Sequence, residues 1–214
     1  MRRLREREAA GTNPPWALLS YLLRYPDAVV AAASEDLPAE VAAMPESPAK
    51  EPLLRFVAAR GGVPDLAAHY VETFDLRRRA SLELTYYAHG DTRERGMAML
   101  RLKKLYRAAG LPMYSAELPD HLTVMLAFAA IAGPERGEAL LAEHRPAIEL
   151  LRLSLHDMES PYAHVLDAVA ACLPELSTQE RSEVARLARE GPPEEAVGLE
   201  PYGPPEAMPE GARA

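Results

Sequence analysis

Apolar residues recur every three or four positions along most of this chain, and that spacing restricts its fold more than any other feature. Side chains spaced in this way lie on one face of a helix, which can then be buried. Four stretches show it: Ala98, Leu102, Leu105 and Ala109; Val124, Phe128 and Ile131; Leu141, His144, Ile148, Leu151 and Leu155; and Val165, Leu166, Val169, Ala170 and Leu173. The pattern predicts an all-helical protein.

Residues typical of helix ends lie between these stretches. Helix starts are predicted where a capping side chain precedes a proline or has an acid three residues later, at Ser47-Pro48, Ser160-Pro161, Asp91-x-x-Glu94 and Ser177-x-x-Glu180. Helix ends are predicted at Gly110 and Gly133. Pro146 interrupts the longest stripe, so we expect a break or kink near His144.

Only residues 82–87 alternate in the manner of a strand. An isolated strand has nothing to pair with, so we interpret this stretch as helical. Residues 18–189 then form nine or ten helices in a single bundle, with the helical domain spanning 14–190. We expect residues 1–13 to be flexible and the Pro-, Gly- and Glu-rich residues 191–214 to be disordered.

Composition excludes several classes of function. The formal net charge of −8 argues against a nucleic-acid-binding protein, which needs a basic surface, and suits a cationic partner. Cys172 is the only cysteine, which excludes an intrachain disulfide and a cysteine-built metal centre. The longest apolar stretch, 122–132, is too short for a membrane span, and the basic start lacks a signal-peptide cleavage site. We expect a cytoplasmic protein with no direct membrane insertion.

Local catalytic motifs are missing from the sequence. It has no glycine-rich phosphate loop, no G-x-S-x-G and no H-E-x-x-H, and none of its six histidines forms an i, i+4 pair. Asp120-His121 resembles half of a catalytic dyad, but adjacent residues on a helix point in different directions. We therefore predict a binding protein with no catalytic residue, metal or cofactor. A small helical enzyme using Asp120, His121 and His89 is the alternative.

Two stretches carry a family resemblance. The first runs from Y-V-E-T-F-D-L-R-R-R at 70–79 through L-T-Y-Y to H-G-D-T-R-E-R-G at 89–96. The second is E-L-P-D-H-L at 117–122, followed by V-M-L-A-F at 124–128. Together they resemble the nitrate reductase molybdenum cofactor assembly chaperones of the NarJ type, which belong to the redox-enzyme maturation chaperones. The resemblance covers roughly residues 16–152.

The resemblance implies a function. Members of the family are all-helical and bind the N-terminal segment of the immature catalytic (alpha) subunit. They hold this subunit off the membrane until its molybdenum cofactor has been inserted. A monomer or weak dimer that binds the apo subunit through that peptide is thus implied here. A chaperone for another molybdoenzyme of the same superfamily is the nearest alternative.

The resemblance also implies a peptide-binding site. In related chaperones the aspartate and histidine of P-D-H lie at the cleft, which implicates Asp120 and His121, with Pro119 fixing the entry to the helix. Each could instead be structural, Asp120 as a helix cap. Further candidates, each with a plainer explanation in core or surface packing, are Tyr70, Phe74, Tyr86, Tyr87 and Glu117, with Glu72 as a possible acidic rim. We expect the basic run 77–79 to be solvated.

Overall fold

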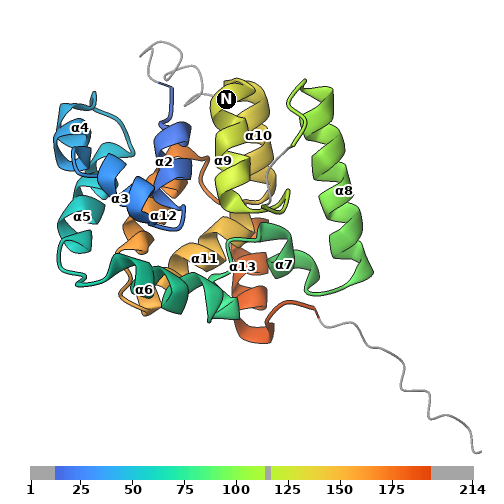
Figure 1. The fold of residues 1–214 in the computed structure, drawn as a ribbon. Helices are drawn as coiled ribbons and strands as arrows, with labels where there is room; N and C mark the ends of the chain where they lie inside the picture. The colour runs from blue at the N-terminus through green and yellow to red at the C-terminus, as the bar shows by residue number, and fades with distance from the viewer. Residues whose placement is uncertain (1–12, 114–116, 194–214) are drawn as a thin grey trace, which may run out of the picture.

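The computed structural model describes residues 13–113 and 117–193, and these residues form a bundle of short helices (Figure 1). The first half contains α2 (Trp16–Leu22), α3 (Ala28–Ala33), α4 (Leu37–Ala43), α5 (Lys50–Arg60), α6 (Leu66–Tyr70), a π-helical turn (Val71–Asp75), a 3-10 turn (Arg78–Ala80) and α7 (Leu84–His89). The second half contains α8 (Arg93–Ala108), α9 (Leu122–Ile131), α10 (Pro134–Glu143), α11 (Arg145–Asp157), α12 (Tyr162–Cys172) and α13 (Thr178–Glu190). The all-helical prediction is confirmed.

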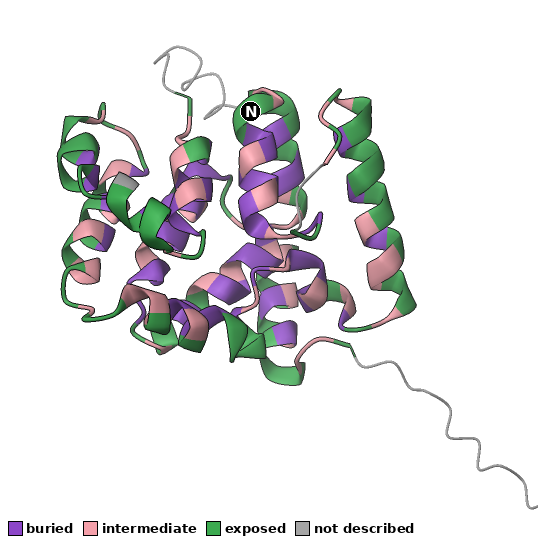
Figure 2. Ribbon diagram, viewed as in Figure 1, coloured by how far each residue is buried: buried purple, intermediate pink, exposed green. Residues whose placement is uncertain are grey.

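Helix α12 lies at the centre of the bundle. Val165, Leu166 and Val169 have no exposed surface, and the helix packs against α2, α5 and α11. Helix α9 in turn packs against α2 and α10, and α13 packs against α11. Figure 2 shows the buried residues concentrated where these helices meet, whereas α8 stands at one edge with most of its surface exposed. An edge helix leaves room for a groove beside it.

The predicted helix ends are confirmed at four places. Ser177 and Glu180 form a capping box at the start of α13. Gly110 and Gly133 follow α8 and α9 with φ of 79° and 88°, a left-handed conformation that glycine adopts without steric cost. The predicted break near His144 separates α10 from α11.

Three predicted helix starts are wrong in detail. Helix α5 begins at Lys50, two residues after Pro48, and α12 begins at Tyr162, one residue after Pro161, and neither is capped by a serine side chain. The Ser160 hydroxyl is instead hydrogen-bonded to Nε2 of His69 at 2.8 Å. Thr92, not Asp91, is the residue that precedes α8, and the Asp91 side chain forms an ion pair with Arg95.

Two further expectations differ from the structure. The described residues contain twelve α-helices rather than nine or ten, since the first 45 residues divide into three short helices that periodicity does not resolve. Residues 82–87 are helical only from Leu84, and Glu83 before it is extended. The expectations for residues 1–12 and 194–214 fall outside the described residues.

None of the helices in the described parts of the chain has both the length and the apolar character required to cross a membrane.

Candidate functional site

The P-D-H turn is clasped to a distant segment by backbone hydrogen bonds. The N–H of Leu84 donates to the carbonyl oxygen of Asp120 at 3.0 Å, and the N–H of Leu122 donates to that of Leu82 at 2.8 Å. Glu83 and His121 therefore face each other in an antiparallel β-bridge, which explains the strand-like pattern of residues 82–84. This clasp fixes the turn at the start of α9 independently of its side chains.

Asp120 is completely buried beneath the clasp. Its Oδ2 accepts a hydrogen bond from Oγ1 of Thr85 at 2.5 Å and one from the N–H of Thr85 at 3.3 Å. The Nη2 atom of Arg95 lies 3.7 Å from the same oxygen. Asp120 thus joins the turn to the first turn of α7, and it has no surface with which to contact a ligand directly.

Arg95 connects three segments around this carboxylate. Its guanidinium pairs with Glu83, with Asp91 at 3.1 Å and with Asp120, and it lies 5.7 Å from the ring centroid of Tyr86. Burial by itself would lower the pKa of Arg95, but the hydrogen bond to Glu83 and the surrounding carboxylates raise it. The buried carboxylate of Asp120 is therefore compensated by a permanent cation, as a buried charge requires.

His121 is the part of the motif that reaches the surface. Its Nδ1 is hydrogen-bonded to Oγ1 of Thr123 at 2.6 Å, and its Nε2 lies 3.9 Å from Oε2 of Glu117. Burial lowers the pKa of His121, and the field of Glu117 opposes that shift. The His121 side chain is 15% exposed and that of Glu117 is 59% exposed, so this pair is accessible from solvent.

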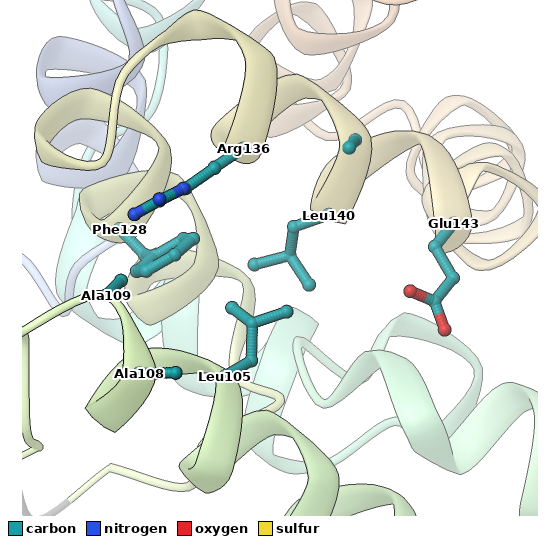
Figure 3. A pocket seen from close by; sticks show the side chains of 8 residues that line it. Leu105, Ala108, Ala109, Phe128, Arg136, Leu140 and Glu143 are labelled. Atoms are coloured by element: carbon teal, nitrogen blue, oxygen red, sulfur yellow. The ribbon is translucent and has the colours of Figure 1, made fainter.

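Tyr106 of α8 links the motif to a groove. Its hydroxyl donates a hydrogen bond to the carbonyl oxygen of Pro119 at 2.7 Å, and its ring lies 4.8 Å from that of Phe128 on α9. Phe128 lines an open cavity of about 430 Å³ between α8, α9 and α10 (Figure 3). We call this cavity the α8–α10 groove. It is lined by Leu105, Ala108, Ala109, Phe128, Arg136, Ala139, Leu140 and Glu143.

The lining of the α8–α10 groove is mainly apolar. Figure 3 shows Leu105 of α8 facing Leu140 of α10 across it, with Phe128 beside them. Arg136 and Glu143 are the two charged residues of the lining, and they lie toward opposite ends. An apolar floor with charges at its ends is suited to the apolar face of a partner helix.

Tyr70 and Phe74 lie in the core rather than in a groove. They do share a helical face as predicted, with ring centroids 4.7 Å apart, but both rings pack on Tyr162 of α12. The hydroxyl of Tyr70 donates to the carbonyl oxygen of Leu23, and the two residues are only 6% and 8% exposed. In this conformation they offer almost no surface to a peptide.

Tyr86 and Tyr87 line a second cleft, which shares no lining residue with the α8–α10 groove. This cleft, of about 450 Å³, lies between α7 and helices α11 and α13, and its lining includes Leu153 together with Arg78 and Arg79. Tyr87 is anchored by hydrogen bonds to the carbonyl oxygens of Arg79 and Ser81. The residues of the basic run 77–79 are exposed, in agreement with the sequence.

The candidate residues therefore divide into groups. Glu117, Pro119, Asp120 and His121 come together at the clasp. Tyr86 adjoins it through Arg95 and through an N–H that donates to the carbonyl oxygen of Glu83, whereas the hydroxyl of Tyr87 is directed to Arg79 and Ser81. Glu72 is exposed. No three His, Cys, Asp or Glu side chains are arranged to hold a metal ion in residues 13–113 and 117–193. Sequence reasoning missed Thr85, Arg95 and Tyr106, because each acts through a partner in a distant segment.

The profile of the nitrate reductase delta subunit family matches residues 42–168, which include the clasp, α8 and the α8–α10 groove. The chain belongs to the nitrate reductase delta subunit family. The resemblance found from the sequence is thus confirmed, and the family match spans both of the stretches that carried it.

The chain is similar in sequence to several proteins of known name. The probable nitrate reductase molybdenum cofactor assembly chaperone NarJ of Bacillus subtilis is 33% identical over 79% of this chain and 94% of its own length. The chaperone NarJ of Escherichia coli K12 is 34% identical over 70% of this chain and 65% of its own length. The nitrate reductase-like protein NarX of Mycobacterium tuberculosis is 40% identical over 72% of this chain. That match spans only 23% of NarX, so the chain corresponds to about a quarter of this larger protein.

Proposed function

We propose that this protein is a cytoplasmic assembly chaperone of a respiratory nitrate reductase. In this role it binds the N-terminal segment of the immature catalytic (alpha) subunit and keeps that subunit competent for molybdenum cofactor insertion before membrane attachment. It makes and breaks no covalent bond itself. Support comes from the family match and from two relatives that are named as assembly chaperones of this enzyme.

The observation that carries the proposal is the connection between the α8–α10 groove and the P-D-H turn. Tyr106 contacts both, through its hydroxyl on Pro119 and its ring against Phe128. A short amphipathic helix of the client can place its apolar side on the groove floor, between Leu105 and Leu140. Ordering such a segment costs entropy, so we expect a Kd on the order of micromolar to tens of nanomolar.

The residues of the motif take different roles in this proposal. Asp120 is a positioning residue, since it is buried and acts through Thr85 and Arg95. His121 and Glu117 are accessible and form a polar end to the site, where a basic residue of the client can pair with the Glu117 carboxylate. Glu117 then supplies an acidic rim at the clasp, and Glu143 is a further acid in the lining of the groove.

A matched pair of variants tests where the peptide binds. Leu105 in the α8–α10 groove is 39% exposed, and Leu153 in the Tyr86–Tyr87 cleft is 40% exposed, so a charge at either position should be tolerated by the fold. Calorimetric titration with a synthetic peptide of the client's first residues should show saturable binding to the wild type. Leu105→Glu should weaken it at least about tenfold, because an unpaired carboxylate would be buried by the bound peptide.

Leu153→Glu should leave the affinity unchanged. The reverse result would place the client in the Tyr86–Tyr87 cleft, and absence of binding to the wild type would contradict peptide recognition altogether. A peptide from another molybdoenzyme of the superfamily provides the specificity control, and tighter binding of that peptide would reassign the client.

A further inference from the structure

Helix α8 exposes a basic surface on a chain that is acidic as a whole. Its outward residues include five cationic side chains and a single exposed acid, Glu94, whereas the chain carries a formal charge of −8. Met97 and Leu100 lie among them and are 62% and 51% exposed. We call this surface the α8 basic face; its cations are Arg93, Arg101, Lys103, Lys104 and Arg107.

The cations of the α8 basic face lack partners in the described parts of the chain. Arg95, on the inner side of the same helix, pairs with three carboxylates. By contrast, none of the five outward cations makes a side-chain ion pair or hydrogen bond with residues 13–113 or 117–193. Helix α7 is the element with the largest contact to α8, and it lies at the helix start. Concentrated like charge beside exposed apolar side chains is the pattern expected of a binding surface.

Residues 194–214, which lie outside the described residues, have the opposite composition. They contain five glutamates and one arginine, a formal charge of −4, interspersed with Val197, Leu199, Tyr202 and Met208. An acidic segment with scattered apolar residues complements a basic helix face in which two apolar side chains are exposed.

The described part of the chain ends beside the start of α8. The carbonyl oxygen of Pro193 packs so closely over Gly90 that a Cβ at Gly90 would lie 1.8 Å from it. Gly90 is three residues before Arg93, the first residue of α8. Figure 1 shows the chain leaving the body near the α7 end of α8. The acidic segment is therefore tethered at one end of the basic face.

The tether length matches the surface. A random-coil peptide of 21 residues would have a root-mean-square span of about 25 Å, and a helix of 16 residues is about 24 Å long. Each exposed ion pair contributes little by itself, but a short tether raises the effective concentration to the millimolar range, so several weak contacts suffice.

We infer that the acidic segment 194–214 docks intramolecularly on the α8 basic face. Its glutamates pair with the outward arginines and lysines, and its apolar residues cover Met97 and Leu100. The contact covers the outer side of the helix that forms one wall of the α8–α10 groove. This inference stands on charge and tether geometry and does not depend on which client the groove accepts.

Carbodiimide coupling of the full-length protein tests the inference, because it joins only carboxylates and amines in contact. The chain has just three lysines, Lys50, Lys103 and Lys104. We expect crosslinks from Lys103 and Lys104 to glutamates at 194, 195, 200, 206 and 210, identified by mass spectrometry. Lys50, whose Nζ lies 2.8 Å from Oε1 of Glu46, provides the internal positive control. Coupling yield at Lys103 and Lys104 should fall several-fold between about 0.05 M and about 0.5 M salt.

A variant with all five glutamates changed to glutamine should lose these crosslinks and keep the one at Lys50. If Lys103 and Lys104 fail to couple to the segment while Lys50 couples to Glu46, the inference is wrong. Crosslinking in a mixture of isotopically heavy and light protein distinguishes docking within one chain from docking between two chains. Crosslinks only within one isotope support docking in the same chain, and crosslinks between heavy and light copies overturn it.

Discussion

The hydroxyl of Tyr106 donates a hydrogen bond of 2.7 Å to the carbonyl oxygen of Pro119, which joins α8 to the P-D-H turn. The two residues are 13 positions apart, and both the phenol and the carbonyl are buried. Helix α8 lies at the edge of the bundle, so this bond is one of its few fixed attachments to the side that carries α9. It sets the position of one groove wall relative to the motif.

Tyr106→Phe should therefore loosen the groove without removing its apolar lining. The loss leaves a buried carbonyl unpaired and should lower the free energy of unfolding by about 1–2 kcal/mol, measured by urea denaturation. Peptide affinity should fall as well. Tyr21→Phe removes a similar bond, to the carbonyl oxygen of Val30 at 3.1 Å, and should leave affinity unchanged. Equal affinities of Tyr106→Phe and wild type would show that the bond does not shape the groove.

Asp120→Ala should destabilise the fold strongly while leaving the far-ultraviolet circular dichroism helical. The change strips a partner from Thr85 and a neutralising carboxylate from Arg95, which should cost about 3 kcal/mol. Asp120→Asn keeps an acceptor for Thr85 and should cost less. Asp75→Ala, at an exposed position, should change stability by less than about 0.5 kcal/mol. A melting temperature of Asp120→Ala equal to that of wild type would refute the buried network.

Two glycines should respond in opposite directions to substitution by alanine. A Cβ at Gly137 of α10 would lie 2.5 Å from Cα of Ala129 on α9, so Gly137→Ala must push the two helices apart and should destabilise the protein by about 1–3 kcal/mol. A Cβ at Gly96 of α8 meets nothing within 4 Å, so Gly96→Ala should stabilise by about 0.5–1 kcal/mol. Thermal unfolding of both variants checks this, and the same sign for both would contradict the α9–α10 packing.

His121 should make stability fall as the pH drops. Burial lowers the pKa of His121 in the folded state below the ordinary histidine value of about 6.5, so the unfolded chain takes up a proton first as the pH falls. The stability associated with neutral His121 is present above about pH 6.5, and it is lost as the pH falls through the pKa of His121 in the folded protein. His121→Asn, which retains a polar atom near Thr123, should flatten the dependence of unfolding free energy on pH between about 7 and 5. If the unfolding free energy of the variant depends on pH with the same slope as that of the wild type, His121 is not the source of the pH dependence.

Local rules predicted the features whose partners are near in sequence. Ser177 and Glu180 are three residues apart and form their box as expected, and Gly110 and Gly133 end helices through their own backbone freedom. Ser160 failed as a cap because its hydroxyl meets His69, which is 91 positions away. A local pattern carries no information about such a partner.

The same distinction explains the candidate site. The i, i+4 spacing of Tyr70 and Phe74 correctly placed them on one face, but only the position of Tyr162 shows that this face points inward. Asp120 was found through family resemblance, whereas its burial depends on Thr85 and Arg95 from two other segments. The peptide-binding roles of the candidate residues remain predictions.

The backbone clasp between residues 82–84 and 120–122 has a consequence for how this fold can vary. It joins the two ends of the segment that contains α7 and α8, so this segment forms a closed loop. The entropy of closing a loop grows slowly, and doubling its length costs only about 0.6 kcal/mol. Insertions near Gly110 should therefore be tolerated well, which would let a designer resize one wall of the groove without rebuilding the bundle.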